Sequence, residues 1–229
     1  MSTRPSEDQT PMTSVLLLHG GTIPHYRVPI YSYLSRYLRQ HGFDLSVTST
    51  AIQERNPHPV DFEFIELSLS LVNITRLIWR RQIDVMILFV DMRHLYLFPT
   101  YLIAKGIFGI KMVWWGQGRD LADQKAIIKN AAYTTEHALC DAIILYAEHL
   151  KKYVSPMFHR KIFVANNTLV FGQKTEQRRA RAKEDVLASY GIRTAKNIIC
   201  VGRFQKRKRI DRLVAAIQST RRADIGLIL

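Results

Sequence analysis

Two basic residues near the end of the chain have the spacing of a phosphate-binding pair. Arg203 follows the apolar run Asn197–Val201, which predicts a strand, and Lys208 lies where a helix is expected to begin. Ligands of open α/β sheets bind at the carboxyl ends of strands, and helix amino termini attract anions. Two fixed cations there would stabilise the charge that develops on a departing diphosphate. A solvated basic loop is the plainer alternative.

Two glycines follow the first apolar run of the chain. Gly20 and Gly21 come directly after Val15–His19, which predicts a buried strand. Glycines at that point allow backbone N–H groups to approach a phosphate or a sugar closely, although an ordinary turn would use them as well. The sequence contains no G-x-G-x-x-G pattern, so a nicotinamide or flavin dinucleotide is a poor fit.

A third polar group follows an apolar segment in the middle of the chain. The run Trp114–Asp120 reads WWGQGRD and places Gln117 between two glycines. A glutamine side chain can donate and accept hydrogen bonds but cannot titrate, so Gln117 could not act as a general base. A structural turn with two packed tryptophans would explain the same residues.

The elements that would hold these residues alternate between strand and helix. Apolar runs predict strands at 15–19, 44–48, 62–67, 85–90, 111–115, 142–145, 162–164, 197–201 and 225–229. Amphipathic segments predict helices at 29–40, 69–81, 94–108, 122–139, 148–153, 184–190 and 209–218. This alternation is typical of an α/β fold with a Rossmann-like, doubly wound parallel sheet.

Composition suggests where this fold divides. We expect a disordered leader at 1–13, a first domain at 14–170, a linker with a helix at 171–196 and the beginning of a second Rossmann-like domain at 197–229. Two strands and one helix bury too little apolar surface to stand alone. The second unit should therefore dock onto the first or form the front part of a longer domain.

Four segments together resemble retaining glycosyltransferases of the two-Rossmann (GT-B) architecture, in particular glycosyltransferase family 4. They are Pro24–Tyr31, Val113–Asp120, Asp141–Ile144 with Val164–Leu169, and Val201–Asp211, the last of which is similar to the V-G-R-x4-K-x-x-D pattern of the family. The resemblance covers roughly 15–229. It implies an acceptor-side GT-B domain that continues into the start of the nucleotide-sugar-binding domain.

The resemblance also implies a reaction and a set of site residues. The reaction is transfer of a sugar, with retention, from a nucleotide-sugar to a cell-envelope or polysaccharide acceptor, which can be lipid-linked. The implied donor-binding residues are Arg203, Lys208, Gly20 and Gly21, and the implied acceptor-side residues are His25, Tyr26, Arg27, Gly118 and Arg119. Gln117 stands where the family often has a histidine, and Asn167 matches the asparagine of an interdomain hinge.

The loop with His25, Tyr26 and Arg27 leaves two possibilities open. A pyrophosphate or an acidic sugar on the acceptor would suit Arg27. In plain packing terms, Tyr26 would instead lie in the core and Arg27 would be exposed. The sequence has neither a D-x-D nor an H-E-x-x-H pattern, so we expect no metal and no cofactor beyond the nucleotide-sugar substrate.

The chain of 229 residues carries a formal net charge of +14, and only two cysteines, Cys140 and Cys200, occur far apart. A disulfide scaffold is excluded, and a reducing, cytoplasmic compartment fits. The segment 69–81 combines an apolar face, Trp79 and a cationic end, as in helices that bind anionic membrane surfaces, although a helix covering a sheet looks similar. We therefore expect a cytoplasmic protein, peripheral at the inner membrane face.

Two other functions are compatible with the sequence. The chain could be a non-catalytic, truncated or split glycosyltransferase half that binds a second polypeptide supplying the missing carboxyl-terminal part. A basic α/β protein could also bind nucleic acid, but no helix-turn-helix, zinc-finger or RRM signature is present, so we expect no nucleic-acid partner.

Overall fold

The computed structural model describes residues 12–90, 92–119, 127–166, 182–202 and 204–229. Arg203, Asn167 and most of the expected leader lie outside these described residues. The chain forms two compact units, Met1–Val170 and Phe171–Leu229. Each unit is described by itself.

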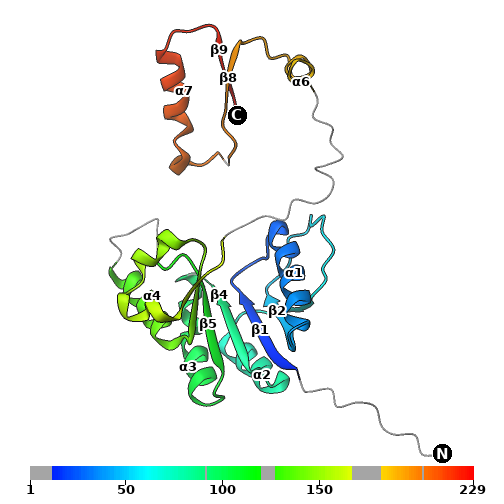
Figure 1. The fold of residues 1–229 in the computed structure, drawn as a ribbon, viewed down its shortest axis with the longest axis vertical. Helices are drawn as coiled ribbons and strands as arrows, with labels where there is room; N and C mark the ends of the chain where they lie inside the picture. The colour runs from blue at the N-terminus through cyan, green and yellow to red at the C-terminus, as the bar shows by residue number, and fades with distance from the viewer. Residues whose placement is uncertain (1–11, 91, 120–126, 167–181, 203) are drawn as a thin grey trace, which may run out of the picture. The chain divides into compact units, whose positions relative to one another are not determined.

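The first unit is built on one parallel sheet of seven strands (Figure 1). The strands are β1 (Thr13–His19), β2 (Phe43–Ser49), β3 (Glu63–Glu66), β4 (Val85–Phe89), β5 (Lys111–Gly116), β6 (Ala142–Leu145) and β7 (Ile162–Val164). Their order is β3-β2-β1-β4-β5-β6-β7, and all neighbouring strands run parallel. The predicted Rossmann-like α/β fold is confirmed, with the strand order reversing between β1 and β4.

Helical segments cover both faces of this sheet. They are η1 (His25–Arg27), α1 (Val28–Arg39), α2 (Leu71–Arg81), η2 (Met92–Leu97), α3 (Phe98–Gly106), α4 (Ile127–Leu139), η3 (Glu148–Tyr153) and η4 (Pro156–Lys161). In β1, Leu16 and Leu18 pack into the core on the side of α2 and α3, whereas Val15 and Leu17 pack on the side of α1. Successive strand side chains point to opposite faces, so the run Val15–His19 fills both core layers.

Two predicted helices differ from the observed ones. The helix expected over 94–108 begins as an α-helix only at Phe98, because Pro99 occupies the first turn, where a missing N–H costs nothing. The preceding η2 is a separate 3-10 segment. The helix expected over 148–153 is also a 3-10 helix, and the extended backbone of Val154 ends it.

Helix α2 shows how local sequence sets an element that covers the sheet. The side chain of Ser70 accepts a hydrogen bond from the backbone N–H of Asn73 at 3.2 Å and caps the amino terminus. Ile74 and Ile78 are buried in the core, and Gln82 ends the helix in a left-handed conformation. Across the described ranges, no helix combines the length and the apolar content that crossing a bilayer requires.

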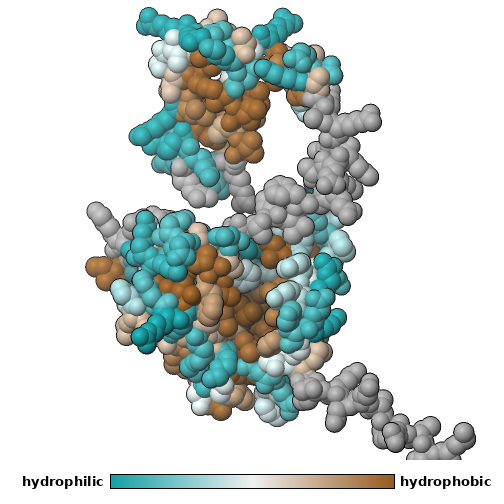
Figure 2. All heavy atoms as spheres, viewed as in Figure 1, coloured by the Kyte–Doolittle hydropathy of each residue, from teal (hydrophilic) through white to brown (hydrophobic). Residues whose placement is uncertain are grey.

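The second unit consists of α6 (Lys183–Ser189), β8 (Lys196–Ile199), η5 (Lys206–Lys208), α7 (Ile210–Ser219) and β9 (Ile225–Ile228), with β8 and β9 parallel. None of its described residues is buried. Apolar side chains remain at its surface, as Figure 2 shows, and Ile199, Val201 and Phe204 are among the exposed ones. Two strands and a helix leave most apolar surface in contact with water.

Adjacent residues of α2 provide a test of this packing. Ile78 is 1% exposed and Trp79 is 67% exposed. Ile78→Ala should lower the free energy of unfolding by about 2–5 kcal/mol, because it leaves a cavity in the core. Trp79→Ala should change it by less than about 0.5 kcal/mol. Urea unfolding of both variants measures this, and equal losses would contradict the orientation of α2.

Candidate functional site

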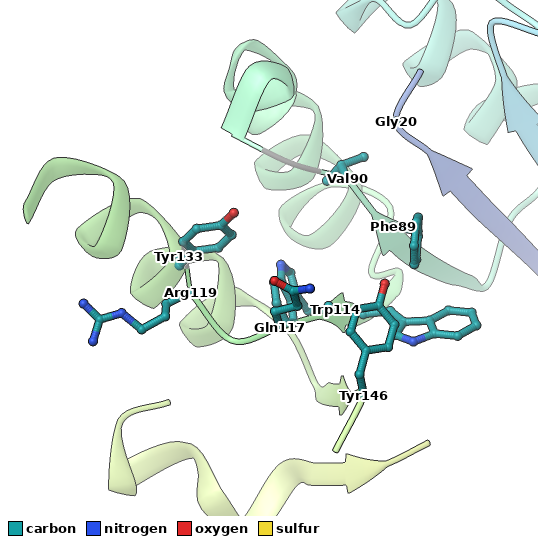
Figure 3. Close-up of a pocket in the computed structure, with 10 residues that line it drawn as sticks. Gly20, Phe89, Val90, Trp114, Gln117, Arg119, Tyr133 and Tyr146 are labelled. Atoms are coloured by element: carbon teal, nitrogen blue, oxygen red, sulfur yellow. The ribbon is translucent and has the colours of Figure 1, made fainter. Parts of the chain in front are cut away.

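The site is formed where four parallel strands end. Gly20, Val90, Gln117 and Tyr146 directly follow β1, β4, β5 and β6, and all four line a cavity of about 200 Å³ (Figure 3). The other lining residues are Phe89, Trp114, Trp115, Gly116, Arg119 and Tyr133. The cavity lies beside the reversal of strand order between β1 and β4, which is where open α/β sheets bind ligands.

Aromatic rings form much of the cavity wall. The ring of Phe89 lies edge-on to Trp115, with centroids 5.3 Å apart, and 6.4 Å from the ring of Tyr146. Behind Phe89, the buried His19 ring stacks at 5.0 Å, and its Nδ1 shares a hydrogen bond of 2.7 Å with the Tyr31 hydroxyl. Aromatic walls that also carry polar groups, here including Gln117 and Arg119, are typical of small-molecule sites.

The two glycines that follow β1, Gly20 and Gly21, have different environments. The N–H of Gly20 donates to the carbonyl oxygen of Phe89 at 2.8 Å, so this donor is already used within the sheet. A Cβ at Gly20 would lie 2.8 Å from the His94 ring, so a larger residue at this position would require that ring to shift. Gly21 has a φ of +79° and open space around it, as a turn requires.

The loop after β5 brings its three predicted residues to the same region. Gln117 is exposed at the cavity, while Gly118 has a φ of +85° and lies against Val154. The guanidinium carbon of Arg119 lies 5.6 Å from the centre of the Tyr153 ring. In Figure 3 the Arg119 side chain points away from Trp114 and Tyr146, although it contributes to the cavity lining.

A buried acid holds the tryptophan beneath this loop. The indole N–H of Trp114 donates to Oε2 of Glu136 at 3.1 Å, and both residues are 2% exposed. Burial raises the pKa of Glu136 to about 7, and the hydrogen bond from Trp114 only partly offsets this. A Cβ at Gly116 would lie 2.5 Å from the Trp114 ring, so the glycine and the indole position fit each other.

The loop before α1 contradicts the packing alternative, in which Tyr26 would be buried and Arg27 exposed. Tyr26 is 41% exposed, whereas Arg27 is only 6% exposed. Nη2 of Arg27 donates to the Tyr146 hydroxyl at 3.2 Å, and its guanidinium lies 4.7 Å from the centre of the Phe89 ring. His25 lies apart from the cavity and bonds the side chain of Gln53.

A second cavity of about 190 Å³ adjoins the first. Its lining residues are Arg27, Ile30, Tyr33, Leu34, Trp115, Tyr146, Ala165 and Asn166. Trp115 and Tyr146 line both cavities. The structure therefore places Gly20, Gln117 and Arg119 on one cavity and Arg27 on its neighbour.

The second unit holds the remaining predicted cation. Lys208 is exposed at the end of η5, its backbone N–H donates to the carbonyl of Gln205 at 2.9 Å, and it makes no ion pair with any described residue. Nearby, Arg209 pairs with Asp211 at 3.1 Å. Because Arg203 lies outside the described residues, the joint action of Arg203 and Lys208 stays a prediction. No group of three or more His, Cys, Asp or Glu side chains in the described ranges could hold a metal ion.

Among the wall residues that the sequence did not select, three are aromatic and lie outside its predicted motifs. Phe89 ends an apolar run, Tyr146 directly follows another, and both positions are strand ends where ligands bind. An aromatic residue at such a position is a signal that sequence analysis could use. Tyr133 has no such signal, because α4 brings it to the cavity from a distant part of the chain.

No protein-family model matches the chain, and no curated protein matches it either. Several solved structures share its fold. A glycosyltransferase from Rickettsia africae has 12% identity and a TM-score of 0.53, with 95% of this chain and 68% of that chain covered. HepE from Anabaena, in complex with UDP-glucose, has 9% identity and a TM-score of 0.60, with 93% and 59% covered. A UDP-N-acetylglucosamine 2-epimerase from Rickettsia bellii has 13% identity and a TM-score of 0.50, with 91% and 59% covered.

These similarities define the class of fold. The first unit has the architecture of the amino-terminal domain of GT-B proteins, a fold shared by nucleotide-sugar glycosyltransferases and epimerases. The chain spans 59% of the length of both HepE and the epimerase. At these identities the likeness concerns the fold, and the membership in family 4 that the four segments suggest stays a prediction.

The buried residues Glu136 and His137 should change the stability of the fold with pH in opposite directions. The folded pKa of Glu136, about 7, lies above its usual 4.5, so its contribution to stability is present at low pH and is lost as pH rises towards 7. Burial, assisted by Lys161, lowers the pKa of His137 from 6.5 to about 4, so its contribution is lost as pH falls below 6.5. Each shift corresponds to about 3 kcal/mol, and the two largely cancel in the wild type.

Glu136→Gln separates the two contributions. The amide introduced by this substitution can still accept the indole hydrogen bond but carries no charge. The variant should match the wild type near pH 4.5 and exceed its unfolding free energy by up to about 3 kcal/mol at pH 8. Urea unfolding at both pH values tests this, with Glu148→Gln on an exposed side chain as the control. If the variant and the wild type differ in unfolding free energy by the same amount at pH 4.5 and at pH 8, burial does not hold Glu136 in its protonated form.

Proposed function

We propose that this chain carries the acceptor-side part, and the beginning of the donor-side part, of a glycosyltransferase that uses a nucleotide-sugar. The observation that carries the proposal is the aromatic cavity at the carboxyl ends of β1, β4, β5 and β6, next to the reversal of strand order. The shared fold with HepE, which was solved with UDP-glucose, supports a nucleotide-sugar as the ligand.

The size of the cavity fits one part of such a ligand. Pockets that enclose drug-sized molecules measure about 300–1,000 Å³, whereas this one measures about 200 Å³. A single sugar ring would occupy it, stacked against aromatic walls. Gln117, exposed at the cavity, would then hydrogen-bond the sugar hydroxyls.

The donor diphosphate would be bound by the second unit. Arg203 and Lys208 would neutralise the charge that grows as the bond between sugar and phosphate breaks. Gly20 and Gly21 would line the donor side of the first unit. Since Gln117 cannot take a proton, the leaving phosphate would accept the proton of the attacking hydroxyl on the same face of the sugar, which gives retention.

The acceptor would bind next to the donor sugar, where the cavity that Arg27 lines adjoins the strand-end cavity. Its proposed contacts are His25, Tyr26, Arg27, Gly118 and Arg119, and Asn167 would serve as a hinge between the units. The acceptor we propose is a cell-envelope or polysaccharide sugar, free or lipid-linked. No metal takes part in this scheme.

Binding of UDP-glucose to the 229-residue chain tests the donor assignment. Lys208→Met should weaken binding about tenfold or more, because a charge-assisted contact contributes about 1.5–3 kcal/mol. Lys196→Met, on an exposed lysine of β8, is the matched control and should leave binding unchanged. Calorimetry measures both, and Arg203→Ala extends the test to the second cation. Equal affinities for all variants would refute the diphosphate assignment.

Product analysis separates this function from its alternatives. A retaining transferase releases UDP and transfers the sugar with the anomeric configuration of the donor, whereas a 2-epimerase changes the configuration at the second sugar carbon. Proton NMR distinguishes these products. Binding of UDP-glucose without turnover would favour a non-catalytic half that needs a second polypeptide, and salt-dependent binding of random DNA without sugar-nucleotide binding would favour the nucleic-acid alternative.

We also propose that the first unit binds an anionic membrane surface through α2 and the residues after α3. Trp79 and Ile107 are 67% and 75% exposed, and Val72 is exposed as well. Leu71, Val72, Thr75, Arg76, Trp79, Arg80 and Phe108 line one shallow groove of about 410 Å³. Neither Arg76 nor Arg80 forms an ion pair with any residue that the structure describes. Apolar side chains beside unpaired arginines suit a bilayer with anionic headgroups.

Vesicle sedimentation tests this surface. The chain should bind vesicles containing phosphatidylglycerol and bind pure phosphatidylcholine vesicles much less. Arg76→Gln and Arg80→Gln should each weaken binding about fivefold, since a basic residue near an anionic surface contributes about 1 kcal/mol. Trp79→Ser should also weaken it, whereas Ile127→Ser, on an exposed isoleucine of α4, should not. Equal binding to both vesicle types would contradict the proposal.

A further inference from the structure

Arg27 is a buried cation with no counter-charge among the residues that the structure describes. It is 6% exposed, and no carboxylate of a described residue lies within ion-pair distance of its guanidinium. Its hydrogen bond to the Tyr146 hydroxyl, at 3.2 Å, involves a neutral acceptor. A buried charge without an opposite charge is costly, so a role beyond folding is expected for it.

Aromatic rings surround this guanidinium. The ring centres of Phe89, Tyr146, Tyr26 and Trp115 lie 4.7, 5.5, 5.8 and 5.9 Å from its central carbon. Two of these residues, Phe89 and Tyr146, are labelled in Figure 3. Ring faces attract a cation but accept little from its N–H groups, which lie in the guanidinium plane. The rings therefore hold Arg27 in place and leave most of its five donors available.

These donors are accessible from a cavity. Arg27 lines the cavity of about 190 Å³ that adjoins the strand-end cavity. Each side-chain nitrogen of Arg27 either has a hydrogen-bond partner or is reached by solvent. The Tyr146 hydroxyl lies beside it, and burial raises the pKa of this hydroxyl above its usual value, so it keeps its proton and can donate as well. An arginine fork next to a hydroxyl donor matches the oxygens of a phosphate or a carboxylate.

We infer that the cavity beside Arg27 binds an anionic group, a phosphate or a carboxylate, carried by the acceptor. That the anion belongs to the acceptor rests on the proposed transferase function, whereas the anion site itself does not. The cavity with Arg27 is next to the strand-end cavity and shares Trp115 and Tyr146 with it. An anion bound at Arg27 would thus place the rest of the same molecule beside the proposed sugar position.

Titration with small anions tests this site in the 229-residue chain. The probes are glucose 1-phosphate for a phosphate and glucuronate for a carboxylate, followed by calorimetry and by the NMR signal of the Arg27 side-chain N–H. We expect at least one probe to bind and to shift this signal. Arg27→Met should weaken that binding tenfold or more, and Arg27→Lys should weaken it less. Arg36→Met, on an exposed α1 arginine paired with Asp61, is the matched control and should leave it unchanged.

Thermal unfolding distinguishes a ligand-binding arginine from a structural one. Arg27→Met should melt at the temperature of the wild type or above, because it removes an unpaired buried charge. The bound probe should raise the melting temperature of the wild type and not that of Arg27→Met. If Arg27→Met does not fold, the NMR signal of Arg27 in the wild type shows by itself whether an anion binds at this residue. A signal that neither probe shifts would overturn the inference.

UDP-glucose separates the inference from the proposed function. We expect UDP-glucose to bind Arg27→Met with the affinity of the wild type. A tenfold loss would mean that Arg27 holds the donor diphosphate, which overturns the acceptor assignment. Failure of UDP-glucose to bind any form, with probe binding intact, would reject the transferase proposal and leave the anion site standing.

Discussion

Everything in the first unit depends on seven strands that all run in one direction. Because the strands are parallel, Gly20, Val90, Gln117 and Tyr146 reach the same edge of the sheet although long stretches of chain separate them. The reversal of strand order between β1 and β4 leaves a crevice at that edge. The helices cover both faces of the sheet with apolar side chains, so a ligand can reach the strands only at their ends.

The cavity wall is held by buried polar groups rather than by apolar packing alone. Glu136 fixes the indole of Trp114 from behind, and the Tyr31 hydroxyl bonds His19 beneath Phe89. Such groups are costly to bury and become worthwhile only when they orient a neighbour. Arg27 differs from them, because rings rather than a carboxylate surround its charge, and this difference points to a ligand.

The two units are unequal in what they bury. The first has two core layers, whereas the described part of the second has no buried side chain. The basic residues of η5 therefore sit on a small sheet that gains little from hydrophobic burial. A bound diphosphate or a covering partner would stabilise this unit by binding its folded form.

Sequence alone determined the strands and the fold class. Each apolar run such as Val85–Val90 can be buried only in a sheet covered on both faces, and that constraint is local to the run. Tertiary structure decided that Arg27 points inward and Tyr26 outward, and that Phe89 and Tyr146 meet at one cavity. Those outcomes depend on side chains brought together from distant strands, so no local pattern encodes them. The raised pKa of Glu136 has the same origin, since burial by neighbouring elements produces it.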